Sequence, residues 1–565
     1  MRGQVYTFDG IGLFSRFLVL ICRQVCHVCR PDPLAILLFI LFFFHVEAAA
    51  LEIGAPAPAF SLQNLDGDSV SLRPPSGGGI LVLYFCDASP GALQILAALH
   101  EIASNASDTL SIQAVSPANP EDLKGAVQDQ AMRSVVLTDD RGVTLSYGLS
   151  RELPAAVIVG PGGIAASVIA PVSAAKDVLA ASAETLVSAG FHASALKLYE
   201  TMSEGWLSAP EKTLAVGYLS GLMGDMDAAR RALEPLSREA SSYSSEAHAA
   251  LGFVSYLEAK DASALVECGR ASTSGFAAWV TAMVKTRAGE CETASTLFDD
   301  AASKKFLFTW QQALAFNMQA RAAEHRADDK AALRLYKKAF ALAPLNGMIS
   351  ANLLAYHWRS DNLPAAAMYA NIITSTGVAD PLVQALVREY ELEAAFAGDR
   401  AAQKRLTEQL AAGPRERDPR SSSPRTVLVH DVPFIGCAPE LNCLPSASAA
   451  FLRTMLEKNG RVVTIRRYAV LAAAKQLGIP ERELRNPLRL AMVAKALSAD
   501  LMTMGEIGNL DGKYVVNLRM VEVNSGKVTA VASETISSLD ALAPAIERLT
   551  QALLQKAAIS SPTPG

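Results

Sequence analysis

The chain has 565 residues, too many for one hydrophobic core, and at roughly 100–200 residues per domain it should hold three or four units. Half of the residues are apolar and 19% are charged, which argues against a mostly disordered chain. The formal net charge of -5 argues against a basic groove for a phosphate backbone, so we expect no nucleic-acid partner.

Residues 1–50 are typical of an export signal preceded by an N-terminal extension. The apolar run Leu34–Val46 has the length of a signal-peptide core rather than of a membrane span, and small residues follow it. We predict cleavage near Ala50 and a mature start at Leu51, and therefore a location in the periplasm or cell envelope. An uncleaved segment that anchors the chain at the membrane is the alternative.

Residues 51–175 predict alternating strands and helices. Buried strands are expected at Ile80–Phe85, Ser111–Val115 and Ala155–Val159, and a helix from about Gly91 to Ser104. The last strand runs into a turn over residues 160–163, Gly-Pro-Gly-Gly. This pattern favours an α/β domain.

Three features of this domain resemble the TlpA-like and peroxiredoxin-like (redoxin) branches of the thioredoxin superfamily. They are the G-x-x-x-P-x-F motif from Gly54 to Phe60, the strand that leads into a helix at residue 91, and the step Leu153-Pro154-Ala155. The resemblance implies a thioredoxin-like fold in which Pro154 is the family's cis-proline.

The sequence departs from that family where the redox thiols should stand. In TlpA-like members the strand leads into W-C-x-x-C, whose first thiol has a lowered pKa at the helix N-terminus. Aligned to that motif, the two cysteine positions hold Ser89 and Ala92, and the T-P-G-C register of peroxiredoxins also ends on Ala92. We therefore assign no catalytic residue. Cys86 is either a small buried residue or a displaced reactive thiol.

Residues 180–411 are rich in alanine and predict helices in pairs. A small residue followed four positions later by a larger one recurs at Ala195/Tyr199, Ala229/Leu233, Ala264/Cys268, Ala294/Phe298, Ala332/Tyr336 and Ala365/Tyr369. The alanines are 34, 35, 30, 38 and 33 residues apart, close to the period of tetratricopeptide (TPR) repeats. The region resembles a TPR α-solenoid, which implies protein or peptide partners in its groove. An irregular helical bundle is the alternative.

After a linker at 412–425, residues 426–557 predict an α+β domain, followed by a disordered tail at 558–565. A hairpin is expected between Met502–Ile507 and Tyr514–Val523, with a return strand at Val528–Glu534. This order, and the stretch from residue 514 to residue 528 above all, resembles the N-terminal domain of TolB and the related curli-secretion lipoprotein domain. Those domains bind envelope proteins or assemble into oligomers.

Five cysteines follow the predicted signal. In an oxidising compartment Cys437 could pair with Cys443 across a short loop, and Cys268 could pair with Cys291 to staple neighbouring helices.

No P-loop, nucleophile elbow, H-E-x-x-H motif or C-x-x-C motif occurs in the mature chain, and we expect neither a cofactor nor a metal. The sequence therefore favours a non-catalytic scaffold of the cell envelope. A thiol-disulfide oxidoreductase or peroxidase-like protein working through Cys86, and a subunit of an envelope secretion or assembly complex, are the alternatives. The oligomeric state is not predicted.

Overall fold

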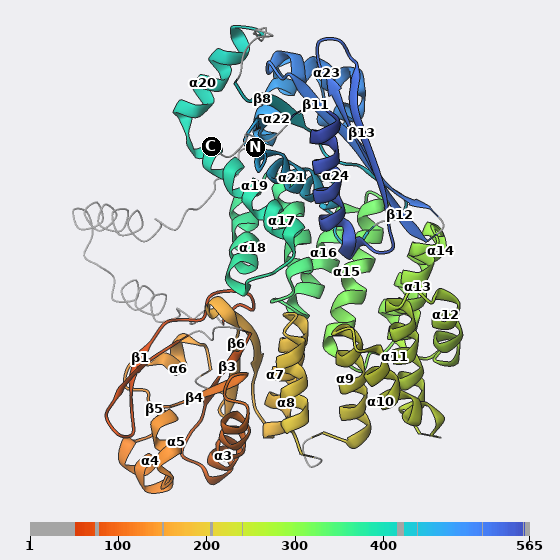
Figure 1. The fold of residues 1–565 in the computed structure, drawn as a ribbon. Helices are drawn as coiled ribbons and strands as arrows, with labels where there is room; N and C mark the ends of the chain where they lie inside the picture. Colours follow the sequence, from red (N-terminus) through yellow and green to blue (C-terminus); the bar gives the residue numbers. More distant parts are fainter. Residues whose placement is uncertain are drawn as a thin grey trace, which may run out of the picture.

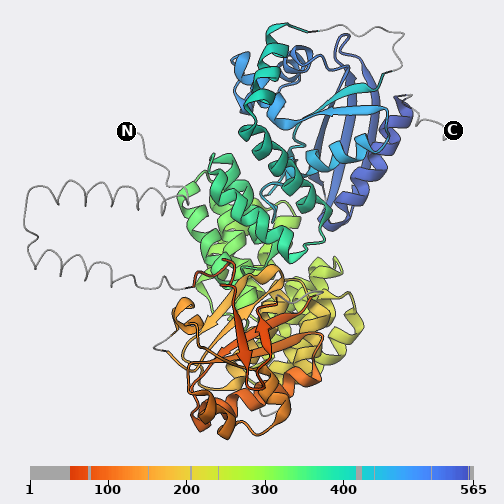
Figure 2. The ribbon, with the colours of Figure 1, turned by 90° about the vertical axis from the view of Figure 1, so that its left-hand side faces the viewer.

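The computed structural model describes residues 51–73, 78–149, 152–203, 207–239, 241–414, 423–437, 439–510, 512–557 and 559. The predicted signal, most of the predicted linker and all of the predicted tail except Ile559 lie outside these ranges. An N-terminal sheet, a helical region and a C-terminal sheet follow one another along the chain (Figure 1). The helical region lies between the two sheets, as the view turned by 90° also shows (Figure 2).

The N-terminal sheet has seven strands in the order β2-β1-β5-β4-β3-β6-β7. The strands are β1 (Ser61–Asn64), β2 (Ser69–Ser71), β3 (Ile80–Phe85), β4 (Leu110–Ser116), β5 (Val136–Thr138), β6 (Ala155–Val159) and β7 (Ala165–Ile169). The interior strand β3 runs parallel to β4 and antiparallel to β6, and every one of its residues is buried. A strand that is apolar along its whole length is therefore covered on both faces.

Helices cover the two faces of this sheet unequally. They are α3 (Pro90–Asn105), α4 (Pro120–Ala126), α5 (Gln130–Val135), α6 (Val143–Ser146), the short η1 (Pro161–Gly163) and α7 (Ala175–Ser188). On one face of β3, Val82 and Tyr84 belong to the apolar cluster that includes residues of α3 and α7. On the other face, Leu83 and Phe85 belong to a separate cluster with Tyr147, the residue that follows α6. The alternation of β3 side chains thus gives each face its own core.

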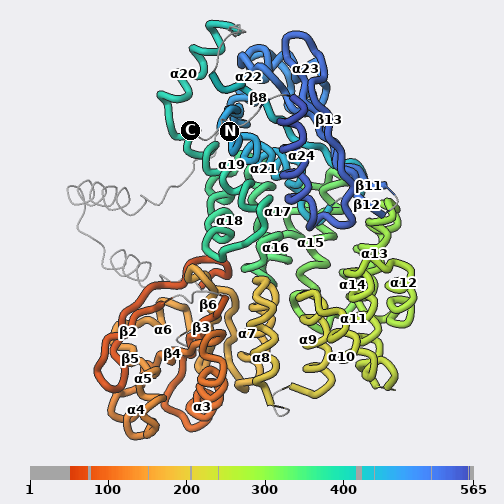
Figure 3. Tube along the Cα trace, in the orientation of Figure 1, coloured from red at the N-terminus to blue at the C-terminus, as the bar shows by residue number. Residues whose placement is uncertain are grey.

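The helical region consists of successive helix pairs that begin with α7. The further helices are α8 (His192–Thr201), α9 (Ala209–Leu222), α10 (Met226–Arg238), α11 (Ser244–Leu257), α12 (Asp261–Arg270), α13 (Gly275–Arg287), α14 (Cys291–Ser303), α15 (Thr309–His325), α16 (Asp329–Leu342), α17 (Gly347–Arg359), α18 (Leu363–Thr376), α19 (Pro381–Gly398) and α20 (Arg400–Ala411). The tube in Figure 3 follows this succession. The recurring alanine and large residue lie on the second helix of each pair and are buried, except in α18, where Ala366 is buried in place of Ala365.

Helix α7 belongs to two parts of the molecule at once. It packs on the N-terminal sheet and forms the first pair with α8, and it also contacts α15 four pairs later in the chain. Aromatic rings pack together in the interior of the helices from α9 to α15. They are Tyr218, Phe253, Phe276, Trp279, Phe308 and Trp310. These rings therefore pack against one another in the interior of this half of the region.

The C-terminal domain is a six-stranded sheet with the order β10-β8-β11-β12-β13 and β9 paired with β11. Its elements are β8 (Arg425–Val429), β9 (Phe434–Ile435), α21 (Leu444–Glu457), β10 (Val462–Ile465), α22 (Arg467–Gln476), η2 (Glu481–Arg485), α23 (Pro487–Ala496), β11 (Leu501–Leu510), β12 (Lys513–Glu522), β13 (Val528–Ile536), η3 (Leu539–Ala541) and α24 (Leu542–Lys556). Helix α21 packs against α19 of the helical region, which joins the two parts.

The turn around η1 packs the N-terminal sheet against a later part of the helical region, at Leu345 and α18. A Cβ built on Gly160 would lie 2.3 Å from Leu345, and one built on Gly162 would lie 2.3 Å from Ser375 of α18. Gly162 also has a φ of +70°. Glycines are thus needed here for close approach, and at Gly162 for its backbone conformation too. Within the described ranges, no helix is both long enough and apolar enough to span a membrane.

Candidate functional site

The N-terminus of α3 is where a thioredoxin-like fold carries its redox thiols, and Ser89 caps this helix. The Ser89 hydroxyl accepts a hydrogen bond from the Ala92 amide at 3.4 Å and donates one to the Asp87 carboxylate at 2.6 Å. The other thiol position holds Ala92, which is 2% exposed, and the hydroxyl of Tyr84 donates to its carbonyl at 3.1 Å. One position is therefore a helix cap and the other is part of the core.

Cys86 lies directly after β3 and is fully buried. Burial, and secondarily the charge of Asp87, raise the pKa of its thiol to about 12. The antiparallel register that pairs Phe85 with Ala155 places Pro154 opposite Cys86 at the end of the strands. The Leu153–Pro154 peptide bond is cis. Because thiol chemistry needs the thiolate, the burial and the raised pKa of Cys86 both disfavour a role as a nucleophile.

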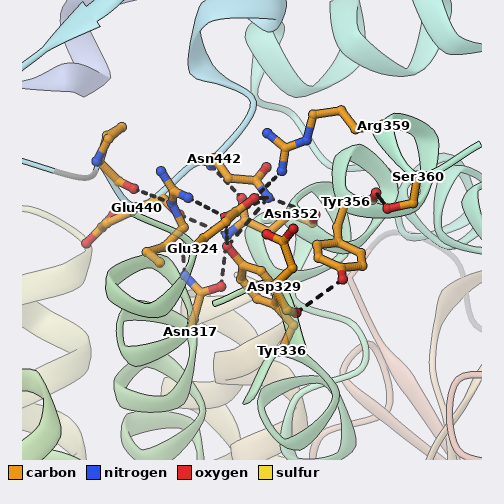
Figure 4. Close-up of polar contacts among 12 residues, drawn as sticks. Asn317, Glu324, Asp329, Tyr336, Asn352, Tyr356, Arg359, Ser360, Glu440 and Asn442 are labelled. Carbon is orange, nitrogen blue, oxygen red and sulfur yellow. Dashed lines mark hydrogen bonds and ion pairs between the residues drawn. The ribbon is translucent and has the colours of Figure 1, made fainter. Parts of the chain in front are cut away.

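A second candidate site lies where the C-terminal domain meets α15 and α17. The connection from β9 to α21 runs across these helices, and we name its described part, Cys437 and residues 439–443, the clasp segment. Asn352 of α17 donates to the Glu440 carbonyl at 2.8 Å and accepts from the Asn442 amide at 2.8 Å (Figure 4). Asn317 of α15 donates to the same carbonyl at 3.4 Å, and Arg321 donates to the Pro439 carbonyl at 2.8 Å.

The Asn442 side chain enters a charged network below the clasp segment (Figure 4). Its amide group donates to the Asn352 carbonyl at 3.1 Å and to both carboxylate oxygens of Glu324 at 3.4 Å. Glu324 also accepts from Tyr336 at 2.7 Å and forms ion pairs with Arg321 and Arg359. Although burial opposes it, these two arginines hold the pKa of Glu324 below its ordinary value. The glutamate therefore stays ionised and available as an acceptor.

The asparagines of this site could have been noticed in the sequence. Asn317 and Asn352 are 35 residues apart, which is one repeat period, and Nδ2 of Asn352 donates to Oδ1 of Asn317 at 2.9 Å. Both are buried in helices that are otherwise rich in alanine. A polar residue that recurs with the repeat on a buried helix face is a signal of a binding surface. The sequence does not indicate that Asn442 binds these residues, because this contact arises only in the tertiary structure.

The structure corrects both predicted disulfides, because it pairs Cys291 with Cys437, 146 residues apart. Cys291 opens α14 at the rim of the site, and the clasp segment carries Cys437 to it. Cys443 is buried at the start of α21, and Cys268 is buried between α11 and α12, where its sulfur would lie 2.5 Å from a Cβ on Gly252. Neither of these two therefore reaches its predicted partner.

Two cavities adjoin the clasp segment. One, of about 680 Å³, lies between the helical region and the C-terminal domain and is lined by residues that include Trp358, Arg359, His430, Asn442, Cys443 and Arg467. The other, of about 440 Å³, is lined by residues that include both cysteines of the disulfide. Among the described residues, no three histidine, cysteine or acidic side chains come together as a metal site would require.

Comparison with known proteins places one family on the N-terminal part of the chain. Residues 53–167 match the model of the AhpC/TSA family, whereas no curated protein matches the chain. Among solved structures, the chain is similar to the thioredoxin domain of a thiol-disulfide oxidoreductase from Bacteroides vulgatus, with 24% identity over 21% of this chain and 89% of that one, at a TM-score of 0.19.

Two further structures are similar over comparable lengths. The exposed lipoprotein thioredoxin of Streptococcus pneumoniae has 20% identity over 22% of this chain and 96% of that one, at a TM-score of 0.20. The LpoB C-terminal domain from Salmonella enterica has 14% identity over 24% of this chain and 93% of that one, at a TM-score of 0.17. The family match and the strand order agree that residues 53–167 form a thioredoxin-like domain of the AhpC/TSA type.

Proposed function

We propose that this chain is a non-catalytic, exported scaffold of the cell envelope, whose thioredoxin-like domain has become a recognition or packing module. The observation that carries the proposal is the state of the two thiol positions: Ser89 caps α3, and Ala92 lies in the first turn of α3 on its buried face. Thiol-disulfide exchange needs a thiolate that can reach a disulfide, and the one nearby thiol, Cys86, is buried with a raised pKa.

In this proposal the helical region is an array of the TPR type that binds protein, and the C-terminal domain is of the TolB N-terminal type. The pairing of successive helices and the buried alanine of each pair support the first assignment. The side chains of α15 and α17 that hold main-chain atoms of the clasp segment support a role in binding extended protein segments.

Export is supported by the Cys291–Cys437 disulfide. Disulfides persist in secreted and periplasmic proteins and are rare in the reducing cytosol. The apolar run expected to act as a signal lies outside the described residues, so the disulfide is the structural support for the location.

A turnover assay tests the proposal. We expect the wild-type chain to show no catalytic insulin reduction and no peroxidase activity, and the Cys86→Ser variant to behave identically. Turnover that depends on Cys86 would overturn the proposal in favour of the oxidoreductase alternative. Ser89→Cys combined with Ala92→Cys is the matched positive control, because it restores thiols at both positions of an otherwise unchanged helix N-terminus.

A further inference from the structure

The Cys291–Cys437 disulfide fastens one short segment to the helical region. Cys291 is the first residue of α14, whereas Cys437 belongs to the connection that leads into the C-terminal domain. Beyond Cys437 the clasp segment crosses α15 and α17 before α21 begins. The disulfide thus lies at one end of the clasp segment, and hydrogen bonds hold the rest of the segment to α15 and α17.

Those polar contacts are directed mainly at the main chain of the clasp segment. Arg321, Asn317 and Asn352 bind the carbonyls of residues 439 and 440, and Asn352 also binds the amide of residue 442. The side chain of Asn442 is also bound, through hydrogen bonds that it donates to the Asn352 carbonyl and to the Glu324 carboxylate. Groups that bind a main chain accept any extended segment of suitable shape, so this surface fits a peptide with a carboxamide side chain at the position of Asn442.

The disulfide can be reached from outside. Both of its cysteines line the cavity of about 440 Å³, together with the apolar side chains of Phe298 and Met318 and the basic side chains of His325 and Arg326. Cys291 is half-buried, whereas Cys437 is buried. An attacking thiolate therefore reaches Cys291 more readily than Cys437. The lining of this cavity also includes the acidic side chains of Glu292 and Asp299, so the preference for Cys291 rests on access and not on charge.

Attack from within the described part of the chain is disfavoured. The free thiols there, Cys86, Cys268 and Cys443, are buried. Burial, as the first cause in each case, raises the pKa of each of these thiols to about 12. Because buried, protonated thiols do not attack disulfides, exchange at Cys291 needs an external thiol.

We propose that Cys291–Cys437 is an exchangeable disulfide, which a dithiol reductant opens to free the clasp segment and expose a binding site for an extended peptide on α15 and α17. The inference rests on the proposed scaffold function and identifies the ligand class and the control of that site. One thiolate of the reductant bonds to the Cys291 sulfur, and the Cys437 sulfur leaves and takes a proton.

The second thiol of the reductant then displaces Cys291 from the mixed disulfide. The reductant ends as a disulfide, and Cys291 and Cys437 end as thiols, a transfer of two electrons and two protons. The clasp segment remains attached to the domain at both ends but has lost its covalent bond to α14. Its polar contacts then compete with those of another peptide.

Hydrogen exchange of the full chain gives the first test. With dithiothreitol, the main-chain amides of residues 440–443 should exchange at least about tenfold faster, while those of α21 change little. The Cys437→Ser variant should show the same fast exchange without reductant, and Cys268→Ala, which removes a cysteine outside the disulfide, should not. Equal exchange in the oxidised and reduced chains would overturn the proposal, as would a Cys437–Cys443 bond in the disulfide map.

Peptide binding gives the second test. The probe is a labelled peptide of residues 432–445 with serine at both cysteine positions, and the Asn442→Ala chain is used so that its own segment competes less. We expect this chain to bind the probe at least about tenfold more tightly after reduction, and Asn352→Ala to abolish the gain. No gain on reduction would overturn the proposal. It would leave the non-catalytic function intact, because turnover is measured separately.

Discussion

Ser89 and Ala92 lie at the start of α3, where we expect a thioredoxin-like domain to carry its redox thiols. The serine hydroxyl provides the helix cap, and Ala92 lies on the buried face of α3. The Ser89 hydroxyl has both a donor and an acceptor as partners, so the helix begins with a capped N-terminus and without a thiol.

Arg453 and Glu389 form a buried ion pair between α21 and α19. Arg453 is 1% exposed and donates to Glu389, which is 5% exposed, at 3.2 Å and to the Val429 carbonyl at 2.9 Å. We expect Arg453→Met to lower the free energy of unfolding by about 3–5 kcal/mol, because Glu389 would remain buried without its cation. Urea denaturation measures the loss.

The matched control for this prediction is the double variant Arg453→Met with Glu389→Leu. It removes both charges, so it should recover much of the lost stability. A double variant as unstable as Arg453→Met alone would contradict the explanation by an unpaired charge.

At the scale of elements, the N-terminal sheet meets α18 through a turn that has no room for a side chain. Gly162→Ala would place a methyl group 2.3 Å from Ser375 at a φ of +70°. We expect a loss of about 2–4 kcal/mol from overpacking and backbone strain together, measured by chemical denaturation. Gly142→Ala is the control, since Gly142 has a φ of +71° with nothing within 4 Å, and it should cost only about 1 kcal/mol. Equal losses in the two variants would argue against tight docking.

The contact between α7 and α15 should depend on pH. The Thr309 amide at the start of α15 donates to Glu184 of α7 at 2.7 Å, and burial raises the pKa of Glu184 from 4.5 to about 7. The pKa of this carboxyl is higher in the folded chain than in the unfolded chain. Its contribution to stability is therefore complete below pH 4.5, and it is lost as the pH rises through about 7.

We therefore expect wild-type stability to fall between pH 5 and pH 8 relative to Glu184→Gln, by about 2 kcal/mol after allowance for partial exposure. Glutamine keeps an oxygen acceptor for Thr309 and does not ionise, so it isolates the charge. If the free energy of unfolding changed by the same amount between pH 5 and pH 8 in both proteins, ionisation of Glu184 would not be the cause.

At the scale of the whole molecule, the parts share one continuous apolar cluster that runs from the N-terminal sheet through the helical region to α24. We expect the parts to unfold together. Arg453→Met, in the C-terminal domain, should therefore lower the melting temperature seen by tryptophan fluorescence, although Trp279, Trp310 and Trp358 lie in the helical region. An unchanged fluorescence transition would show that the C-terminal domain unfolds by itself.

The sequence by itself determined the local structure. The strands Ile80–Phe85 and Ala155–Val159 have the bounds that their apolar runs predict, and the paired helices recur with the alanine spacing. These features depend on periodicity and on turn residues within a short stretch of chain. That residues 89 and 92 are serine and alanine rather than cysteine is likewise read directly from the sequence.

Only the tertiary structure decided which distant residues meet. Cys291 pairs with Cys437 rather than with Cys268 because α14 and the clasp segment are brought together by the coiling of the whole helical region. For the same reason, Asn352 of α17 binds Asn442, which lies 90 residues later in the chain. The rotation from one helix pair to the next sets such contacts, and it arises from packing summed over many pairs, which no local pattern records.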